Sequence, residues 1–183
     1  MHSIPPSWFS RDATIIAKEL LGKVIEYKGC SGMIVETEAY MSDEASHGFK
    51  LTPRSKIMHE THGHVYVYFI YGMYYCLNFT TNKDSVGAVL IRALEPLEGV
   101  SLMQKRRKVK DVHQLMSGPG KVCRALKIST ALNGSRIGDQ LKIYAYKNIP
   151  DIMIGCSSRI GISRSQELEW RFFIKNNPFV SKH

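Results

Sequence analysis

The chain has 183 residues, of which 44% are hydrophobic, and a formal net charge of +9. One hydrophobic core and a single domain over residues 1–183 are expected at this length. No apolar run reaches the ~18 residues of a membrane span, and the start MHSIPPSWFSRD is unlike a secretory signal. The excess of Lys and Arg favours a polyanionic partner such as nucleic acid.

The four cysteines are widely spaced and form no CxxC pair, and none has a companion histidine at zinc-finger spacing. They are typical of reduced thiols, so we expect a cytoplasmic protein without a membrane anchor.

The first half of the chain predicts a helix followed by two hairpins. Asp12 is suited to cap a helix whose apolar residues lie on one stripe, and Gly22 is a stop signal. KVIEYK and MIVETEAY are expected to pair as strands around a turn at Gly29–Gly32. A long polar loop, MSDEASHGFKLTPRSK, separates them from HVYVYFIYGMYYCLNFTT, which predicts a second hairpin broken by Gly72.

The second half predicts one long strand, two helices and several short strands. GAVLIRALEP favours a buried strand that ends before Pro96. LEGVSLMQKRRKVK is typical of a helix, and Pro119 suits the first turn of a second one. LKIYAY, SSRIGIS and WRFFIKN are expected to be short strands that close the sheet. Because strands outnumber helices and adjoin one another, the expected fold is α+β with a largely antiparallel sheet.

Two glutamates stand one residue apart in IVETEAY, a setting that favours chemistry. On a strand, Ile34, Glu36, Glu38 and Tyr40 would share one face, with the carboxylates about 7 Å apart. A partly buried carboxyl beside a like charge can become a base with a raised pKa. The alternative interpretation is a strand edge with two solvated charges.

The second hairpin carries five tyrosines, at positions 66, 68, 71, 74 and 75. With the turn at Gly72, Tyr66 and Tyr68 would share a face with Cys76 and Asn78, and Tyr71 would lie at the tip. Each tyrosine alone favours core packing. Together, in a basic protein, they favour stacking on bases or wedging between base steps.

Three further motifs give weaker signals. HETHGH at residues 59–64 has histidines three apart and a glycine, which disfavours the helical zinc motif, so no metal is expected. QKRRKVK indicates either a solvated face or phosphate contact. SGPGK lacks full phosphate-loop spacing, although its helix start could receive a backbone phosphate.

Several blocks together resemble the alkyladenine (3-methyladenine) DNA glycosylase family. They are IVETEAY, YVYFIYGMYYCLN, LIRALEPLEG, SGPGKVCRAL, RIGIS and WRFFIKNNPFVS, in matching order from about Leu20 to Ser181. The resemblance implies one domain with a curved antiparallel sheet, flanking helices and a protruding hairpin that enters the minor groove of DNA. It also implies hydrolysis of the N-glycosidic bond of a flipped, damaged purine, without metal or other cofactor, by a monomeric enzyme.

The resemblance assigns the chemistry to two residues. Glu38 matches the general base, and Arg92 matches the arginine that holds the water and the nucleotide backbone. Glu36 is left as a supporting carboxylate.

The resemblance also assigns the contacts with DNA. Tyr40 matches the stacking partner on one side of the extruded base, and His47 and Tyr68 match the other side. Asn78 matches the residue that disfavours the amine of guanine, and Tyr71 the side chain that fills the gap in the duplex. Further contacts with DNA are expected from Tyr66, Arg54 and Lys121.

The chain departs from the family pattern in two places. The connection GFKL after His47 is shorter than in mammalian relatives, and HETHGH is richer in histidine. The short stretch before the first expected helix fits a compact bacterial-type enzyme, and such an enzyme is expected to associate with the nucleoid through DNA. Two alternatives stay open: a bifunctional glycosylase in which a lysine attacks the sugar, and a non-catalytic duplex-binding module.

Overall fold

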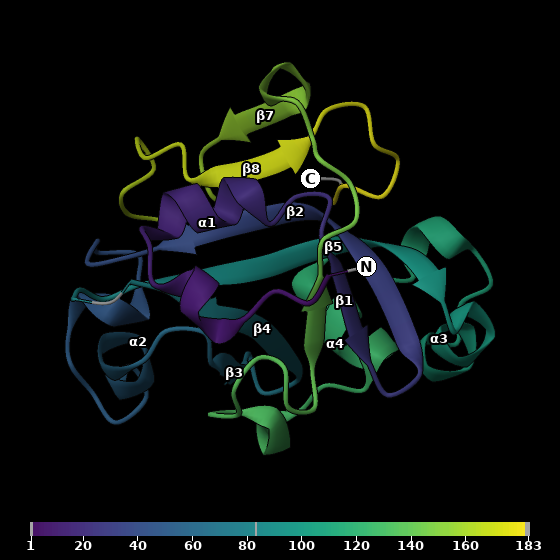
Figure 1. Ribbon diagram of the computed structural model, residues 1–183, viewed down its shortest axis with the longest axis horizontal. Helices are drawn as coiled ribbons and strands as arrows, with labels where there is room; N and C mark the ends of the chain where they lie inside the picture. The colour runs from purple at the N-terminus through teal and green to yellow at the C-terminus, as the bar shows by residue number, and fades with distance from the viewer. Residues whose placement is uncertain (1, 83, 182–183) are drawn as a thin grey trace.

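The protein is a single α+β domain built on a mostly antiparallel, open sheet (Figure 1). The computed structural model describes residues 2–82 and 84–181. Its strands are β1 Val24–Tyr27, β2 Cys30–Tyr40, β3 Val65–Ile70, β4 Tyr74–Thr80, β5 Ala88–Glu98, β6 Lys142–Tyr144, β7 Ile154–Ser157 and β8 Arg171–Ile174. Six run in the order β3-β4-β5-β2-β1-β6, while β8 pairs with β2 and β7. The expected α+β class is confirmed.

In the part of the chain that the structure describes, four α-helices and five short 3-10 turns accompany the sheet. The helices are α1 Ala13–Glu19, α2 Lys56–Glu60, α3 Val100–Arg107 and α4 Pro119–Leu126, and the turns are η1 Pro6–Phe9, η2 His47–Phe49, η3 Val112–Gln114, η4 Thr130–Leu132 and η5 Asp151–Met153. The Asp12 carboxylate caps α1 by accepting from the Thr14 amide at 2.8 Å, as the sequence predicted. Helix α1 packs on β2, β5 and β8, while α4 packs on β4 and β5.

Strand β2 is the central support of the site because both of its edges are covered. One edge pairs with β5 from Ser31 to Tyr40, and the other pairs with β1 and then with β8 at residues 36–38. Glu36 and Glu38 are completely buried, and the backbone amides of Ser181 and Ile160 donate to their carboxylates. The alternative of two solvated charges on a strand edge is wrong.

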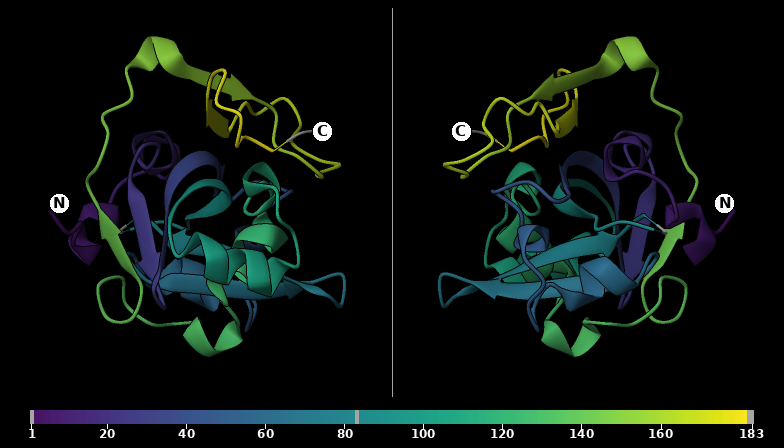
Figure 2. Two further views of the ribbon diagram at one scale, coloured as in Figure 1. Left: turned by 90° about the vertical axis from the view of Figure 1, so that its right-hand side faces the viewer. Right: turned by 90° about the vertical axis from the view of Figure 1, so that its left-hand side faces the viewer.

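The β3–β4 hairpin extends beyond the body of the domain (Figure 2). Tyr66 lies opposite Asn78 and Tyr68 opposite Cys76, so the predicted register is confirmed. Tyr71 and Gly72 both have positive φ, of 54° and 67°, which is the combination that a type I′ turn requires. The Tyr71 side chain is left 77% exposed at the tip.

Two boundaries differ from the sequence prediction. The first hairpin turns at Lys28 and Gly29, and Gly32 lies inside β2, where a Cβ would meet the Met116 side chain at 2.8 Å. Strand β5 does not end before Pro96 but continues to Glu98. Strand β5 pairs with β4 only at residues 88–90. Beyond residue 90 the edge of β5 that faces away from β2 is not paired with β4, so this edge tolerates a proline.

Two local assignments were also wrong. SSRIGIS is not a strand beyond Ser157, because residues 158–163 form a loop instead. The long polar segment after β2 is not entirely loop, since η2 lies within it and α2 begins at Lys56. LKIYAY and WRFFIKN do contain strands, β6 and β8.

Candidate active site

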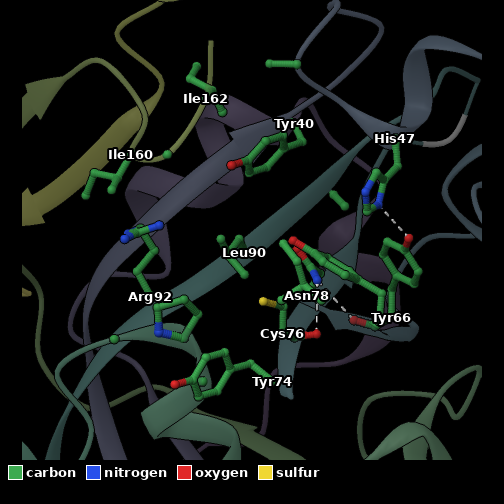
Figure 3. A pocket seen from close by; sticks show the side chains of 18 of the residues that line it. Tyr40, His47, Tyr66, Tyr74, Cys76, Asn78, Leu90, Arg92, Ile160 and Ile162 are labelled. Carbon is green, nitrogen blue, oxygen red and sulfur yellow. Dashed lines mark hydrogen bonds between the residues drawn. The ribbon is translucent and has the colours of Figure 1, made fainter. Parts of the chain in front are cut away.

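An aromatic pocket of about 470 Å³ opens between the hairpin, the end of β2 and the start of α4 (Figure 3). Its walls combine residues that are far apart in sequence: Tyr40, Ala45, His47, Met58, Tyr66, Tyr68, Ile70, Tyr71, Tyr74, Cys76, Asn78, Ala88, Leu90, Arg92, Gly118–Lys121 and Ile160–Ile162. All of the sequence-predicted base-binding residues are in this set. Its size, and an apolar lining that includes several aromatic rings, suit a planar ligand such as a purine.

Glu38 lies one layer behind the pocket wall, with no exposed surface. Its Oε1 accepts from the Ile160 amide at 2.7 Å, while Oε2 accepts from the Tyr40 hydroxyl at 2.8 Å and from Arg92 Nη1 at 3.3 Å. All three donor residues line the pocket. The carboxylate is thus connected to the cavity through its own hydrogen-bond donors.

Glu36 organises the arginines behind the site. Its Oε1 accepts from Arg171 Nε at 2.7 Å and from Arg92 Nε at 3.3 Å, and Ser181 donates its amide and its hydroxyl to the same carboxylate. Arg92 therefore bridges the two glutamates, and two guanidinium groups compensate the two buried negative charges. Without such pairing, carboxylates buried to this degree would be strongly destabilising.

The aromatic wall opposite Tyr40 comes from His47 and the hairpin. His47 Nδ1 and the Tyr66 hydroxyl are 2.9 Å apart, and the His47 and Tyr68 rings pack edge to face with centroids 4.6 Å apart. Burial, assisted by the nearby charge of Arg54, lowers the pKa of His47. Burial also raises the pKa of Tyr66 to about 12 and raises the pKa of both Tyr40 and Tyr68. The wall is therefore electrically neutral near pH 7.

Asn78 is held rigidly within the pocket. Its Nδ2 donates to the backbone carbonyls of Tyr66, at 3.2 Å, and of Cys76, at 3.3 Å, and the side chain is almost fully buried. Both amide hydrogens are thus committed to the hairpin backbone, so the orientation of the group is fixed.

Lys121 and Tyr71 of the hairpin tip line the pocket, and the charge of Arg54 lies close enough to His47 and Tyr66 to affect their pKa values. Arg54 is exposed, and Lys121 Nζ is 3.1 Å from Ser117 Oγ at the start of α4. Gly120, one residue earlier, packs so closely on Tyr74 that a Cβ would lie 2.9 Å from its ring. Tyr71, Gly120 and Lys121 line the pocket, whereas Arg54 does not belong to its lining. Their contact with DNA stays a prediction.

The weaker motifs have structural roles in the described ranges. HETHGH spans the end of α2 and the approach to β3, and within residues 2–82 and 84–181 no three His, Cys, Asp or Glu side chains gather as a metal-binding cluster. In the basic run, Arg106 donates to the Ala125 carbonyl at 2.8 Å and Arg107 to the Leu115 carbonyl at 3.0 Å.

None of the described helices is long and apolar enough to cross a membrane.

The loop at residues 158–162 supplies residues that the sequence interpretation missed. Ile160 gives the amide for Glu38, Gly161 has a φ of 74°, and the buried Arg159 stacks between two aromatic rings. Because a backbone N–H leaves no trace in residue type, only the left-handed conformation favoured by the glycine of RIGIS hinted at a specific turn here.

Comparison with known proteins shows the family. Residues 7–178 match the model of the Methylpurine-DNA glycosylase (MPG) family. The chain therefore belongs to this family, and its predicted class, DNA glycosylase, is confirmed.

Relatives agree with this over nearly the full length. A protein of Prosthecochloris aestuarii is 44% identical, covering 100% of this chain and 92% of the relative. One of Rhizobium etli is 46% identical, covering 96% and 87%, and one of Clostridium novyi is 41% identical, covering 100% of both. Each carries the name "Putative 3-methyladenine DNA glycosylase".

Proposed function

We propose that this protein removes alkylated purines such as 3-methyladenine from duplex DNA by hydrolysing the N-glycosidic bond, and so leaves an abasic site. Ethenoadenine and hypoxanthine are further candidate substrates. The observation that carries the proposal is the position of Glu38: a carboxylate whose three hydrogen-bond donors all belong to the wall of an aromatic, purine-sized pocket.

Base flipping brings the nucleotide to the pocket. Extruding a nucleotide costs a few kcal/mol, less when its base pair is damaged, and stacking on aromatic rings returns ~1–3 kcal/mol per base. Tyr40 on one side and His47 with Tyr68 on the other form the slot. Tyr71, exposed at the hairpin tip, fills the gap left in the duplex, while Arg54 and Lys121 contact phosphates.

Hydrolysis uses Glu38 as base and as countercharge. Positive charge grows on the sugar as the glycosidic bond breaks, and a nearby carboxylate stabilises it while accepting a proton from water. Arg92 donates to Oε2 and so places a compensating positive charge beside the carboxylate. A carboxylate oxygen accepts two hydrogen bonds, and among the described residues Oε1 receives one, from the Ile160 amide. DNA binding must admit one water to this oxygen.

Asn78 sets the preference against guanine. Its fixed side chain lies in the pocket, so an exocyclic amine on the purine ring would meet it without room to adapt. Adenine-derived lesions and hypoxanthine lack this amine at the corresponding ring carbon. We therefore assign to Asn78 the rejection of undamaged guanine.

The test is to incubate the protein with duplexes that each carry one candidate lesion, and to score alkali-labile abasic sites. Release of the lesion base with an intact strand before alkali is the expected result. Binding to damaged duplex without base release would instead support the non-catalytic alternative.

A lyase reaction is tested separately. Lys121 is the lysine among the described residues that line the pocket, so it is the side chain that would attack the sugar in a bifunctional enzyme. Reduction with borohydride during the reaction is expected to trap no covalent protein–DNA adduct. A trapped adduct that disappears in Lys121→Ala would replace the hydrolytic mechanism.

A further inference from the structure

A buried ion pair lies directly behind the stacking ring of the pocket. Arg159 donates to Asp43 through Nη2 at 2.6 Å and Nη1 at 3.1 Å, and its Nη1 also donates to the Ala39 carbonyl. The Arg159 side chain has no exposed surface, and that of Asp43 is 7% exposed. Because the pair is shielded from water, salt and solvent screen its field only weakly.

The cationic end of this pair faces Tyr40. The guanidinium carbon of Arg159 is 4.7 Å from the centre of the Tyr40 ring and 5.2 Å from that of Trp170, so it is held between two aromatic faces. Of the described residues, Tyr40 lines the pocket and Arg159 does not. The cation therefore occupies the face of Tyr40 that is turned away from the pocket, and a flipped base would stack on the opposite face.

From this arrangement we infer that Arg159 is a specificity-determining residue: its charge, felt through Tyr40, lowers the preference of the pocket for cationic alkylpurines and so favours neutral lesions. The inference rests on the proposed function, because it requires a base stacked on Tyr40. A ring that already interacts with a cation on one face attracts a second cation less strongly on the other. The neighbouring charge of Arg159 also lowers the pKa of Tyr40 against the larger effects of burial and Glu38.

The expected size follows from the distances. A base stacked ~3.5 Å beyond the ring lies ~8 Å from the guanidinium carbon, given the 4.7 Å on the other side. At an effective dielectric constant of ~20, a unit charge at ~8 Å changes the binding of a cation by roughly tenfold or more. As the glycosidic bond breaks, a cationic base leaves as a neutral one and its positive charge moves to the sugar, whereas a neutral base leaves with negative charge. The two lesions therefore differ by one unit of charge at the stacked base both before bond cleavage and in the transition state.

Substitutions of the two members of the ion pair are expected to shift the preference between cationic and neutral lesions in opposite directions, which provides a test. Single-turnover efficiency is measured for duplexes with 7-methylguanine, which is cationic, and with hypoxanthine, which is neutral, and the ratio of the two is compared with that of the wild type. Arg159→Met, which keeps an apolar chain between the rings, is expected to raise the cationic-to-neutral ratio about tenfold. Asp43→Asn, which leaves the guanidinium uncompensated, is expected to lower the ratio about threefold.

Control variants separate charge from structure. Arg159→Lys keeps the charge and is expected to leave the ratio near that of the wild type. The double variant Arg159→Met/Asp43→Asn removes both charges, avoids an unpaired buried ion, and is expected to give a ratio between those of the single variants. The same four variants are also made in a Glu38→Gln background, and their dissociation constants are measured for both duplexes. The binding preference for the cationic over the neutral lesion is expected to shift in the same direction as the ratio of excision efficiencies.

The outcomes are distinct. Ratios that shift in opposite directions for the two single variants support the inference. Ratios that stay constant, or shift in the same direction, overturn it and leave the pair with a structural role. If the wild-type protein releases neither of these bases nor 3-methyladenine, then the proposed function itself has failed, and the inference fails with it.

Discussion

The sharpest prediction concerns Glu38→Gln, a change of one oxygen to an amide nitrogen in a fully buried side chain. The Arg92 and Tyr40 donors will hold the amide oxygen, so the new NH₂ group must face the Ile160 amide, whose nitrogen lies 2.7 Å from Oε1 in the wild type. Two donors then oppose each other, which costs about 1–3 kcal/mol of folding stability. The variant is therefore expected to fold but to be measurably less stable.

The effect on catalysis is expected to be larger. Loss of a general base costs about 10²–10⁴-fold in rate. For a sugar cation at about 5 Å from the carboxylate and an effective dielectric constant of about 20, loss of the negative charge removes about 3 kcal/mol more, or roughly two further orders of magnitude. Base release should fall at least about 10⁴-fold, whereas binding to damaged duplex should be retained.

Glu36→Gln is the matched control, because Glu36 has the same residue type, strand and burial. This change removes the negative charge that Arg171 and Arg92 share and should cost more stability, about 3–5 kcal/mol, yet reduce base release by less than about 10²-fold. Chemical denaturation and single-turnover excision measure the two quantities. Glu38→Gln within tenfold of wild-type activity, or Glu36→Gln as inactive as Glu38→Gln, would refute the assignment of the base.

Three further changes test the walls of the pocket. Tyr71→Ala should leave thermal stability almost unchanged, because Tyr71 is 77% exposed. Excision from duplex DNA should fall about tenfold, as expected for a lost stacking contact, whereas excision from a single strand should not. An equal loss on both substrates would exclude a role of Tyr71 as a wedge in the duplex. Asn78→Ala should raise the efficiency on 7-methylguanine relative to hypoxanthine about tenfold, and an unchanged ratio would show that another group rejects the amine. Burial lowers the pKa of His47 from 6.5, so the unfolded chain binds this proton more tightly than the folded one. The contribution of His47 to folding stability therefore falls as the pH decreases below 6.5 and is constant above this pH. The difference in melting temperature between the wild type and His47→Gln should change with pH in the same way. A difference that does not depend on pH would contradict this prediction.

Much of the local structure could be predicted from residue type and spacing. The Asp12 cap, the helix after it and the hairpin centred on Gly72 follow from capping chemistry and strand periodicity, and they lie where expected. The face shared by Tyr66, Tyr68, Cys76 and Asn78 follows from alternation along paired strands. These features depend on neighbours in sequence, so a single sequence contains the information.

The errors arose where a strand or loop depends on distant partners. Pro96 is tolerated inside β5 because that half of the strand is not paired with β4, and the RIGIS segment is a loop because it wraps over the pocket instead of pairing. Neither fact is visible in local propensity.

The sequence by itself determined which residues could do chemistry: two glutamates in a hydrophobic strand, an arginine in another, and a hairpin rich in tyrosine. Only the tertiary structure decided how their charges are arranged. Glu36 and Glu38 become a buried, arginine-linked pair because β5, β8 and the loop at residue 160 converge on β2. Arg159 meets Tyr40 across 119 positions of sequence. Electrostatic interactions depend on distance in space and on burial, and both are fixed only when the chain has folded.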